Sequence, residues 1–244
     1  MWPFPRPPVP FEQAVYGSFP FWHRGYDLLG RSPDCRDPWI RAMKETCQRL
    51  GERPRGAAPP AGVVSRWLAD GTWMVLHPFS PGSDDVGRPD AVAFHAVFLD
   101  ADSGRRAGYR PMRLAPAFRE DFGPGDGVLA PGSITLPRPG APLVPDDPRA
   151  DTVAEALLHG RRALVESGGP IDRLAEQVWE RLPVRHRHRR SLATWAFADA
   201  GLFDLIGLPR LSGIDPSDRR LLLVPAGPEG QAAPGEGAEG DAIG

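Results

Sequence analysis

The sequence has few of the residues that common nucleotide-binding sites require. Its 244 residues contain a single lysine, Lys44, although lysine and arginine together number 29. A phosphate-binding loop of the form G-x-x-x-x-G-K-S/T needs glycines before its lysine, and Lys44 has none at that spacing. The glycine-rich stretch "GPGDG" at 123–127 does not follow a strand pattern, so it is interpreted as an ordinary loop. The sequence therefore argues against a P-loop nucleotidase and predicts no cofactor.

Net charge of one sign is also lacking. The 29 basic and 31 acidic residues give a formal charge of -2, so the chain as a whole has no field that would hold an anionic polymer. Zinc would need three or four histidine, cysteine or carboxylate ligands at close spacing, whereas the histidines are scattered or surrounded by arginine. These observations argue against a general nucleic-acid role and against a metal site.

Long apolar runs and abundant cysteine are absent as well. No run of 18 apolar residues occurs, and the first residues, "MWPFPRPPVP", do not resemble a secretory signal. Cys35 lies just before the first turn of one predicted helix and Cys47 lies near its end, about 18 Å apart at 1.5 Å per residue, which is too far for a disulfide. We expect a soluble protein of the reducing cytoplasm that contacts no membrane.

The pattern of apolar residues predicts an α+β protein. We expect a central, mostly antiparallel sheet with a β-hairpin, an N-terminal helix and a two-helix element packed on it. The predicted organisation is a proline-rich lead at 1–10, one domain at 11–225 with a proline-rich linker near 137–150, and a disordered tail at 226–244. The predicted strands are 11–19, 25–33, a hairpin at 63–79 with a two-residue Asp70-Gly71 turn, 91–104, 191–197, 203–209 and 220–225, and the predicted helices are 38–50, 112–122, 153–164 and 171–182.

Cys35 is the one residue that could support nucleophilic catalysis. A thiol near the start of a helix has its thiolate stabilised by the helix dipole, and His77 or His95 could act as its base if folding brings them together. Cys47 falls on the apolar face of the same helix and is expected in the core. No G-x-S-x-G motif indicates a serine hydrolase. A cysteine-dependent hydrolase therefore remains an alternative.

The stretch "RLPVRHRHRRSLATWAF" at 181–197 changes from dense positive charge to alternating aromatic residues. We interpret it as a junction between a helix and a strand, in which Trp195 is buried and the arginines are solvated. A second interpretation is a partner-binding patch of Arg185, Arg187, Arg189 and Arg190, and a third is a weak nucleic-acid contact through 185–190. Under all three interpretations, removing the Arg187 and Arg189 side chains should leave folding intact.

Two short motifs resemble one known family. "FEQAVYGSF" carries a Q-x-x-Y-G-S pattern, and "LP" is followed by basic residues and S-x-x-T. The order of these motifs over 11 to about 225 resembles the N-terminal domain of the GTPase-associated proteins of bacterial NTP-dependent conflict systems. The resemblance implies an accessory interaction module beside a GTPase, with no catalytic residues to transfer. The matching positions are Gln13, Tyr16, Gly17, Ser18, Leu182, Pro183, Ser191 and Thr194.

Overall fold

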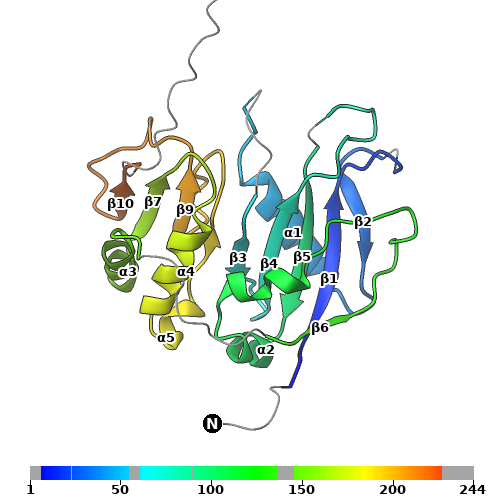
Figure 1. Ribbon diagram of the computed structural model, residues 1–244, viewed down its shortest axis with the longest axis horizontal. Helices are drawn as coiled ribbons and strands as arrows, with labels where there is room; N and C mark the ends of the chain where they lie inside the picture. The colour runs from blue at the N-terminus through cyan, green and yellow to red at the C-terminus, as the bar shows by residue number, and fades with distance from the viewer. Residues whose placement is uncertain (1–6, 23, 55–60, 90, 137–145, 227–244) are drawn as a thin grey trace, which may run out of the picture.

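A single twisted sheet forms the centre of the molecule (Figure 1). The computed structural model describes residues 7–22, 24–54, 61–89, 91–136 and 146–226. Within them the strand order is β10-β7-β9-β8-β3-β4-β5-β1-β2, and β6 pairs with β1. In chain order the elements are β1 (Val9–Gly17), β2 (Asp27–Arg31), α1 (Asp37–Gln48), β3 (Val64–Trp67), β4 (Trp73–Phe79), β5 (Ala93–Leu99), α2 (Ala101–Arg106), the 3-10 helix η1 (Pro111–Ala117), β6 (Gly132–Ile134), α3 (Ala150–Leu158), β7 (Arg162–Glu166), α4 (Asp172–Arg181), α5 (Val184–Arg187), β8 (Leu192–Ala193), β9 (Leu205–Leu208) and β10 (Leu221–Val224).

The sheet has two halves of different character. The antiparallel half comprises β3, β4, β5, β1 and β2, and the parallel half comprises β10, β7, β9 and β8. They meet at the seam, where β3 and β8 run antiparallel. Most pairings are antiparallel, so the predicted α+β class with a mostly antiparallel sheet is confirmed.

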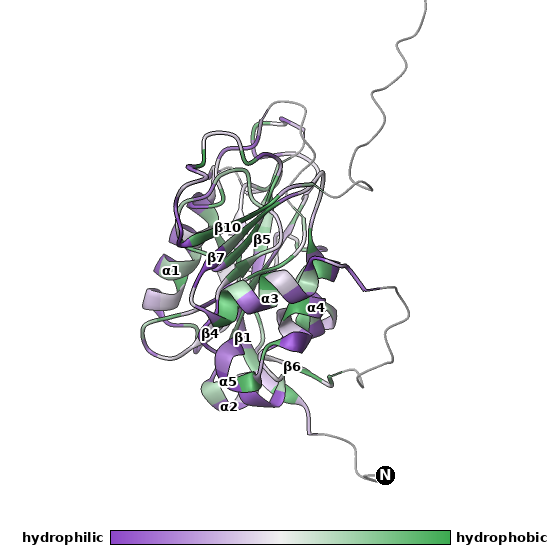
Figure 2. Ribbon diagram, turned by 90° about the vertical axis from the view of Figure 1, so that its left-hand side faces the viewer, coloured by the Kyte–Doolittle hydropathy of each residue, from purple (hydrophilic) through white to green (hydrophobic). Residues whose placement is uncertain are grey.

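Helices cover both faces of this sheet. α1 lies on one face, and α3 and α4 lie on the other (Figure 2). On the first face Met43 of α1 packs in one cluster with Phe98 of the antiparallel half and Ile206 of the parallel half. On the second face of the antiparallel half, η1 inserts Leu114 against Val97 of β5. β5 is buried along its whole length because side chains cover both of its faces.

The predictions of the β3–β4 hairpin and of the helices α1 and α4, which were based on sequence periodicity, are confirmed. Pro38 stands in the first turn of α1, and Pro183 lies between the end of α4 and the first residue of α5, as expected for residues that begin or end helices. The hairpin turn is longer than predicted, because Trp67 pairs with Trp73 and residues 68–72 form the connection. Gly71 still takes the left-handed conformation, at φ +82°.

Four other predictions are wrong in their extent. The helix predicted at 112–122 is the 3-10 helix η1, which ends at Ala117. β1 begins at Val9, so the last residues of the predicted proline-rich lead belong to the sheet. The helix predicted to 164 ends at Leu158, since Gly160 adopts φ +78° and Leu164 lies at the centre of β7. The strand predicted at 191–197 is regular only at Leu192–Ala193. Residues 1–6, most of the predicted linker and the predicted tail from 227 lie outside the described residues.

Thr194 fastens the seam. Its hydroxyl accepts a hydrogen bond from the Val63 amide at 2.8 Å, and its own amide donates to the Val63 carbonyl at 2.9 Å. The Thr194 carbonyl accepts from the amide of Ile171, just before α4. Gly62 approaches so closely, at φ +94°, that an added Cβ would lie 2.1 Å from the Thr194 hydroxyl oxygen. One fully buried residue therefore joins β3, β8 and the start of α4.

Thr194→Val should weaken the whole fold. Valine keeps the side-chain shape and removes the only group that pairs with the Val63 amide, so we expect a loss of about 1–3 kcal/mol in the free energy of unfolding. Urea unfolding followed by circular dichroism measures this change. Thr152→Val, at an exposed position of α3, is the matched control and should change stability by less than about 0.5 kcal/mol. Equal stability of the two variants would contradict the role given to Thr194.

Candidate functional site

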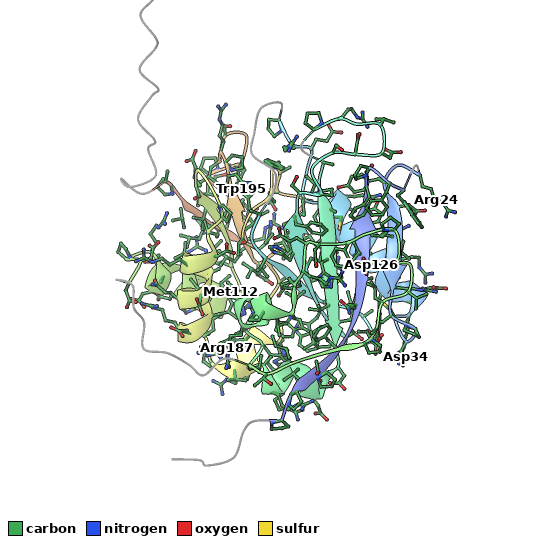
Figure 3. All side chains as sticks on the ribbon, turned by 45° about the vertical axis from the view of Figure 1, so that its right-hand side comes forward. Arg24, Asp34, Met112, Asp126, Arg187 and Trp195 are labelled. Carbon is green, nitrogen blue, oxygen red and sulfur yellow. The ribbon has the colours of Figure 1, made fainter. Side chains whose placement is uncertain are left out.

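Arg187 is the centre of the arginine-rich junction, and it is buried. Its side chain donates from Nε to the Leu182 carbonyl at 2.8 Å, from Nη2 to the Glu180 carbonyl at 3.3 Å and from Nη1 to the Gly108 carbonyl at 3.3 Å (Figure 3). Burial lowers the pKa of the Arg187 guanidinium, and the nearby charge of Arg110 lowers it further. Arg187 thus ties the end of α4 and the helix α5 to the turn that follows α2.

The interpretation of Arg187 as part of an exposed patch is therefore wrong. Arg190 is also engaged, because its guanidinium bonds to the Asp204 carboxylate at 3.0 Å and to the Leu157 carbonyl. Arg185 and Arg189 are exposed, and within the described residues the only side-chain hydrogen bond of either is a 3.4 Å contact from Arg189 Nε to His188 Nε2. The four arginines divide into two that fix the junction and two that face solvent.

The exposed arginines belong to a small mixed surface. We define the α5 surface as Pro183, Val184, Arg185 and Arg189, all of which are exposed. Val184 keeps 48% of its area accessible, which is unusual for a valine beside buried residues. The surface therefore carries two positive charges and one exposed apolar side chain.

Contacts next to the α5 surface also involve the helix α2 and the segment that follows it. Arg110 forms an ion pair with Glu180 at 2.9 Å, which reinforces the link from α4 to the segment after α2. Figure 2 shows α5 and α2 at the same end of the molecule. Asp100 precedes α2 and accepts from the Ser103 amide, and the last turn of α2 carries Arg105 and Arg106. Arg105 forms an ion pair with Asp102 at 2.9 Å, so part of the positive charge of α2 is balanced within the helix.

Residues of the first family motif hold the antiparallel half together. The Gln13 side-chain oxygen accepts from His95 Nε2 at 2.8 Å, and its nitrogen donates to the Ala130 carbonyl at 2.6 Å. Gly17 allows β1 to approach β5, since an added Cβ would lie 2.6 Å from the Ala93 Cβ. The Ser18 hydroxyl donates to the Asp85 carboxylate at 2.9 Å. These three positions have structural roles in the chain.

Residues of the second family motif serve the parallel half in the same way. The Leu182 carbonyl accepts a hydrogen bond from Arg187 Nε, and Pro183 immediately precedes the first residue of α5. The Ser191 hydroxyl donates to the Asp204 carboxylate at 2.8 Å, and Thr194 fastens the seam. Both motifs thus occur where distant segments of the chain are joined.

Cys35 does not meet the histidines proposed as its base. Its side chain is buried in the cluster beneath α1, with Phe94 and Phe98 of β5. The side chains of His77 and His95 lie on the opposite face of the sheet, where both contact Phe118. The sheet therefore separates the thiol from these two imidazoles.

The electrostatics of these groups also oppose catalysis. Burial raises the pKa of the Cys35 thiol to about 12, an effect that exceeds the lowering by Arg31, so the expectation of a stabilised thiolate is wrong. Burial lowers the pKa of His95 to about 3, and the charges of Arg119 and His77 lower it further. His95 is consequently neutral, donating from Nε2 to Gln13 and accepting at Nδ1 from the Arg119 amide. Its two ring nitrogens are both occupied by structural hydrogen bonds.

The α5 surface itself was only partly predicted from the sequence. A junction that leads from a helix into a strand implies extended backbone for the arginine run, and in extended backbone Arg185, Arg187 and Arg189 would share one side. Pro183 is the signal that indicates a helix instead, because proline is favoured at the beginning of helices. At 100° per residue, positions 185 and 189 fall near one side of a helix and 187 near the other. Val184 could not be identified, since nothing in the sequence indicates its exposure.

No family model matches the chain, and no match is found among curated proteins. Within the residues that the structure describes, no group of three or more histidine, cysteine or acidic side chains could hold a metal ion. None of the described helices is both long enough and apolar enough to cross a membrane.

Both cysteines should resist alkylation in the native protein. Cys35 and Cys47 are buried, and their raised thiol pKa values leave little thiolate at pH 8. We expect iodoacetamide to label neither thiol on the time scale that fully labels the protein in urea, as measured by intact mass. Rapid native labelling of Cys35, with Cys47 unmodified as the internal control, would restore the cysteine hydrolase as a possibility.

Arg187→Met should destabilise the protein even though Arg187 lies in a charged stretch. Methionine keeps much of the apolar packing and leaves three backbone carbonyls without their charged donor, so we expect a loss of about 2–3 kcal/mol in the free energy of unfolding. The matched control is Arg185→Met, two residues away and exposed, which should stay within about 0.5 kcal/mol. Chemical unfolding measures the stability of both variants. Equal stability of Arg187→Met and Arg185→Met would contradict the structural role of Arg187.

Proposed function

We propose that the protein is an interaction module that docks onto a GTPase in a bacterial defence or signalling system. The resemblance to the N-terminal domain of GTPase-associated proteins supports the identity of the partner, and we place the complex in the cytoplasm. The observation that carries the proposal is the division of the arginine run. Buried Arg187 fixes α5, while Arg185 and Arg189 project from it into solvent.

A fixed, exposed surface favours docking because little conformational freedom is lost when a partner binds. Three hydrogen bonds from the Arg187 guanidinium attach α5 to the end of α4 and to the turn after α2, so the backbone at Arg185 and Arg189 is held in place in advance. Arginine is enriched at protein interfaces and pairs with carboxylates through two parallel hydrogen bonds. Pre-organisation of this kind supports binding to another protein surface.

The α5 surface also suggests what its partner presents. Two guanidinium groups favour an acidic patch on the partner, and exposed Val184 favours an apolar side chain near that patch. A nucleic acid could satisfy the charges, but a phosphate backbone offers no apolar counterpart for Val184. We therefore propose an acidic protein surface as the partner and treat nucleic acid as the competing outcome.

Charge reversal on the α5 surface should abolish capture of the partner. We expect the tagged full chain to capture a GTPase from a lysate of the source cells, identified by mass spectrometry, and the Arg185→Glu/Arg189→Glu variant to lose it. Wild-type capture should weaken as salt is raised, because exposed charges steer the association. Arg210→Glu/Arg219→Glu is the matched control, since both residues are exposed on the connection between β9 and β10.

Three results would contradict this proposal. Capture that contains no GTPase would remove the identity of the partner, and equal capture by the two double variants would remove the α5 surface as its site. Retention of short DNA or RNA by the wild type, lost in Arg185→Glu/Arg189→Glu, would favour the nucleic-acid contact. Circular dichroism of each variant shows whether its fold is intact.

A further inference from the structure

A pocket of about 220 Å³ opens on the α1 face of the antiparallel half. Four aromatic side chains, from segments that are far apart in the sequence, contribute to its walls. Tyr16 belongs to β1, Tyr26 precedes β2, Phe94 belongs to β5 and Phe197 follows β8. Aromatic walls on several sides suit a flat ring, which can pack face-on or edge-on against them.

The walls of the pocket are held in place by their own contacts. The Tyr26 hydroxyl donates to the Val92 carbonyl, and the Tyr26 ring meets that of Tyr16 edge-on, with centroids 5.1 Å apart. The Phe197 amide donates to the Leu50 carbonyl at 2.7 Å. This last bond fixes the wall that comes from the parallel half. The pocket is therefore formed before any ligand arrives.

Tyr16 differs from the other two tyrosines of the protein. The hydroxyl of Tyr26 donates to Val92, and that of Tyr109 donates to the Ala101 carbonyl at 3.4 Å. The Tyr16 side chain is only 6% exposed, yet within the described residues its hydroxyl makes no hydrogen bond. A tyrosine hydroxyl can donate one hydrogen bond. Because Tyr16 lines the pocket, its hydroxyl is available to a bound ligand.

The charges around the pocket determine what kind of group the ligand offers. Burial raises the pKa of Tyr16, and Cys47 and Asp27 raise it further, so its hydroxyl stays protonated and can donate. Arg53 also lines the pocket, and its guanidinium lowers the pKa of Tyr26 against the larger effect of burial. A hydroxyl donor and a guanidinium beside one aromatic cavity select an anionic acceptor.

We propose that this pocket binds a small planar aromatic carboxylate. Its ring lies among Tyr16, Tyr26, Phe94 and Phe197, and its carboxylate accepts from the Tyr16 hydroxyl and from Arg53. The binding site is separate from the α5 surface and does not depend on the docking function.

Indole-3-carboxylate and indole-3-carboxamide form a matched pair of probes, equal in shape and different in charge. Isothermal titration of the full chain should show binding of the carboxylate and at least about ten-fold weaker binding of the amide, because a charged acceptor strengthens both contacts. Tyr16→Phe should lower the affinity for the carboxylate by about five-fold through loss of one hydrogen bond. Arg53→Gln should lower it by about ten-fold.

Tyr109→Phe is the matched control, because Tyr109 lies on the opposite face of the sheet and its hydroxyl is already paired. It should bind the carboxylate as the wild type does. Tyr16→Phe should also keep the wild-type melting temperature, since it removes a hydroxyl that bonds to no described residue. Three results would overturn the proposal: no binding of the carboxylate at millimolar concentration, equal binding of acid and amide, or affinity unchanged by both Tyr16→Phe and Arg53→Gln.

Discussion

The hydrogen bonds of Thr194 at the seam are the interaction on which the remaining architecture depends. Antiparallel strands on one side and parallel strands on the other become one sheet only because the short strand β8 pairs with β3. Two residue pairs form that ladder, so the contacts of Thr194 extend it where regular pairing ends. The apolar cluster beneath α1 then continues across the seam from Leu76 to Ile206. Both the α5 junction and the wall carrying Phe197 are positioned by the chain that crosses here.

The family-motif residues acquire a common physical meaning in this arrangement. Gln13, Ser18, Ser191 and Thr194 each use a side chain to hold a segment that is distant in sequence. Polar residues with full sets of partners specify one arrangement of the backbone more strictly than apolar packing alone. Tyr16 is the exception within the motifs, because its hydroxyl faces no protein partner among the described residues. Structural and functional residues therefore stand side by side in one short stretch of β1.

Much of the fold could be predicted from the sequence, and the failures have identifiable causes. The hairpin, α1 and α4 follow from strong periodicity and from the placement of Pro38 and Pro183. β7 was missed because a parallel strand that is buried on both faces is apolar throughout, and Leu164 also continues the helical stripe of α3. The candidate site was less predictable. Charge alone could not separate Arg187 from its neighbours, since its burial depends on carbonyls contributed by α4 and by the turn after α2.

The sequence separation at the seam has a consequence for synthesis of the chain. Val63 and Thr194 are 131 residues apart, so β3 is translated long before the strand that completes its edge. During that interval the antiparallel half can assemble, but one side of β3 presents unpaired backbone groups, which is the feature that makes nascent sheets prone to associate with one another. Closing so long a loop also slows the final docking step. The ribosome-bound intermediate, rather than the finished protein, is the species most exposed to misassembly.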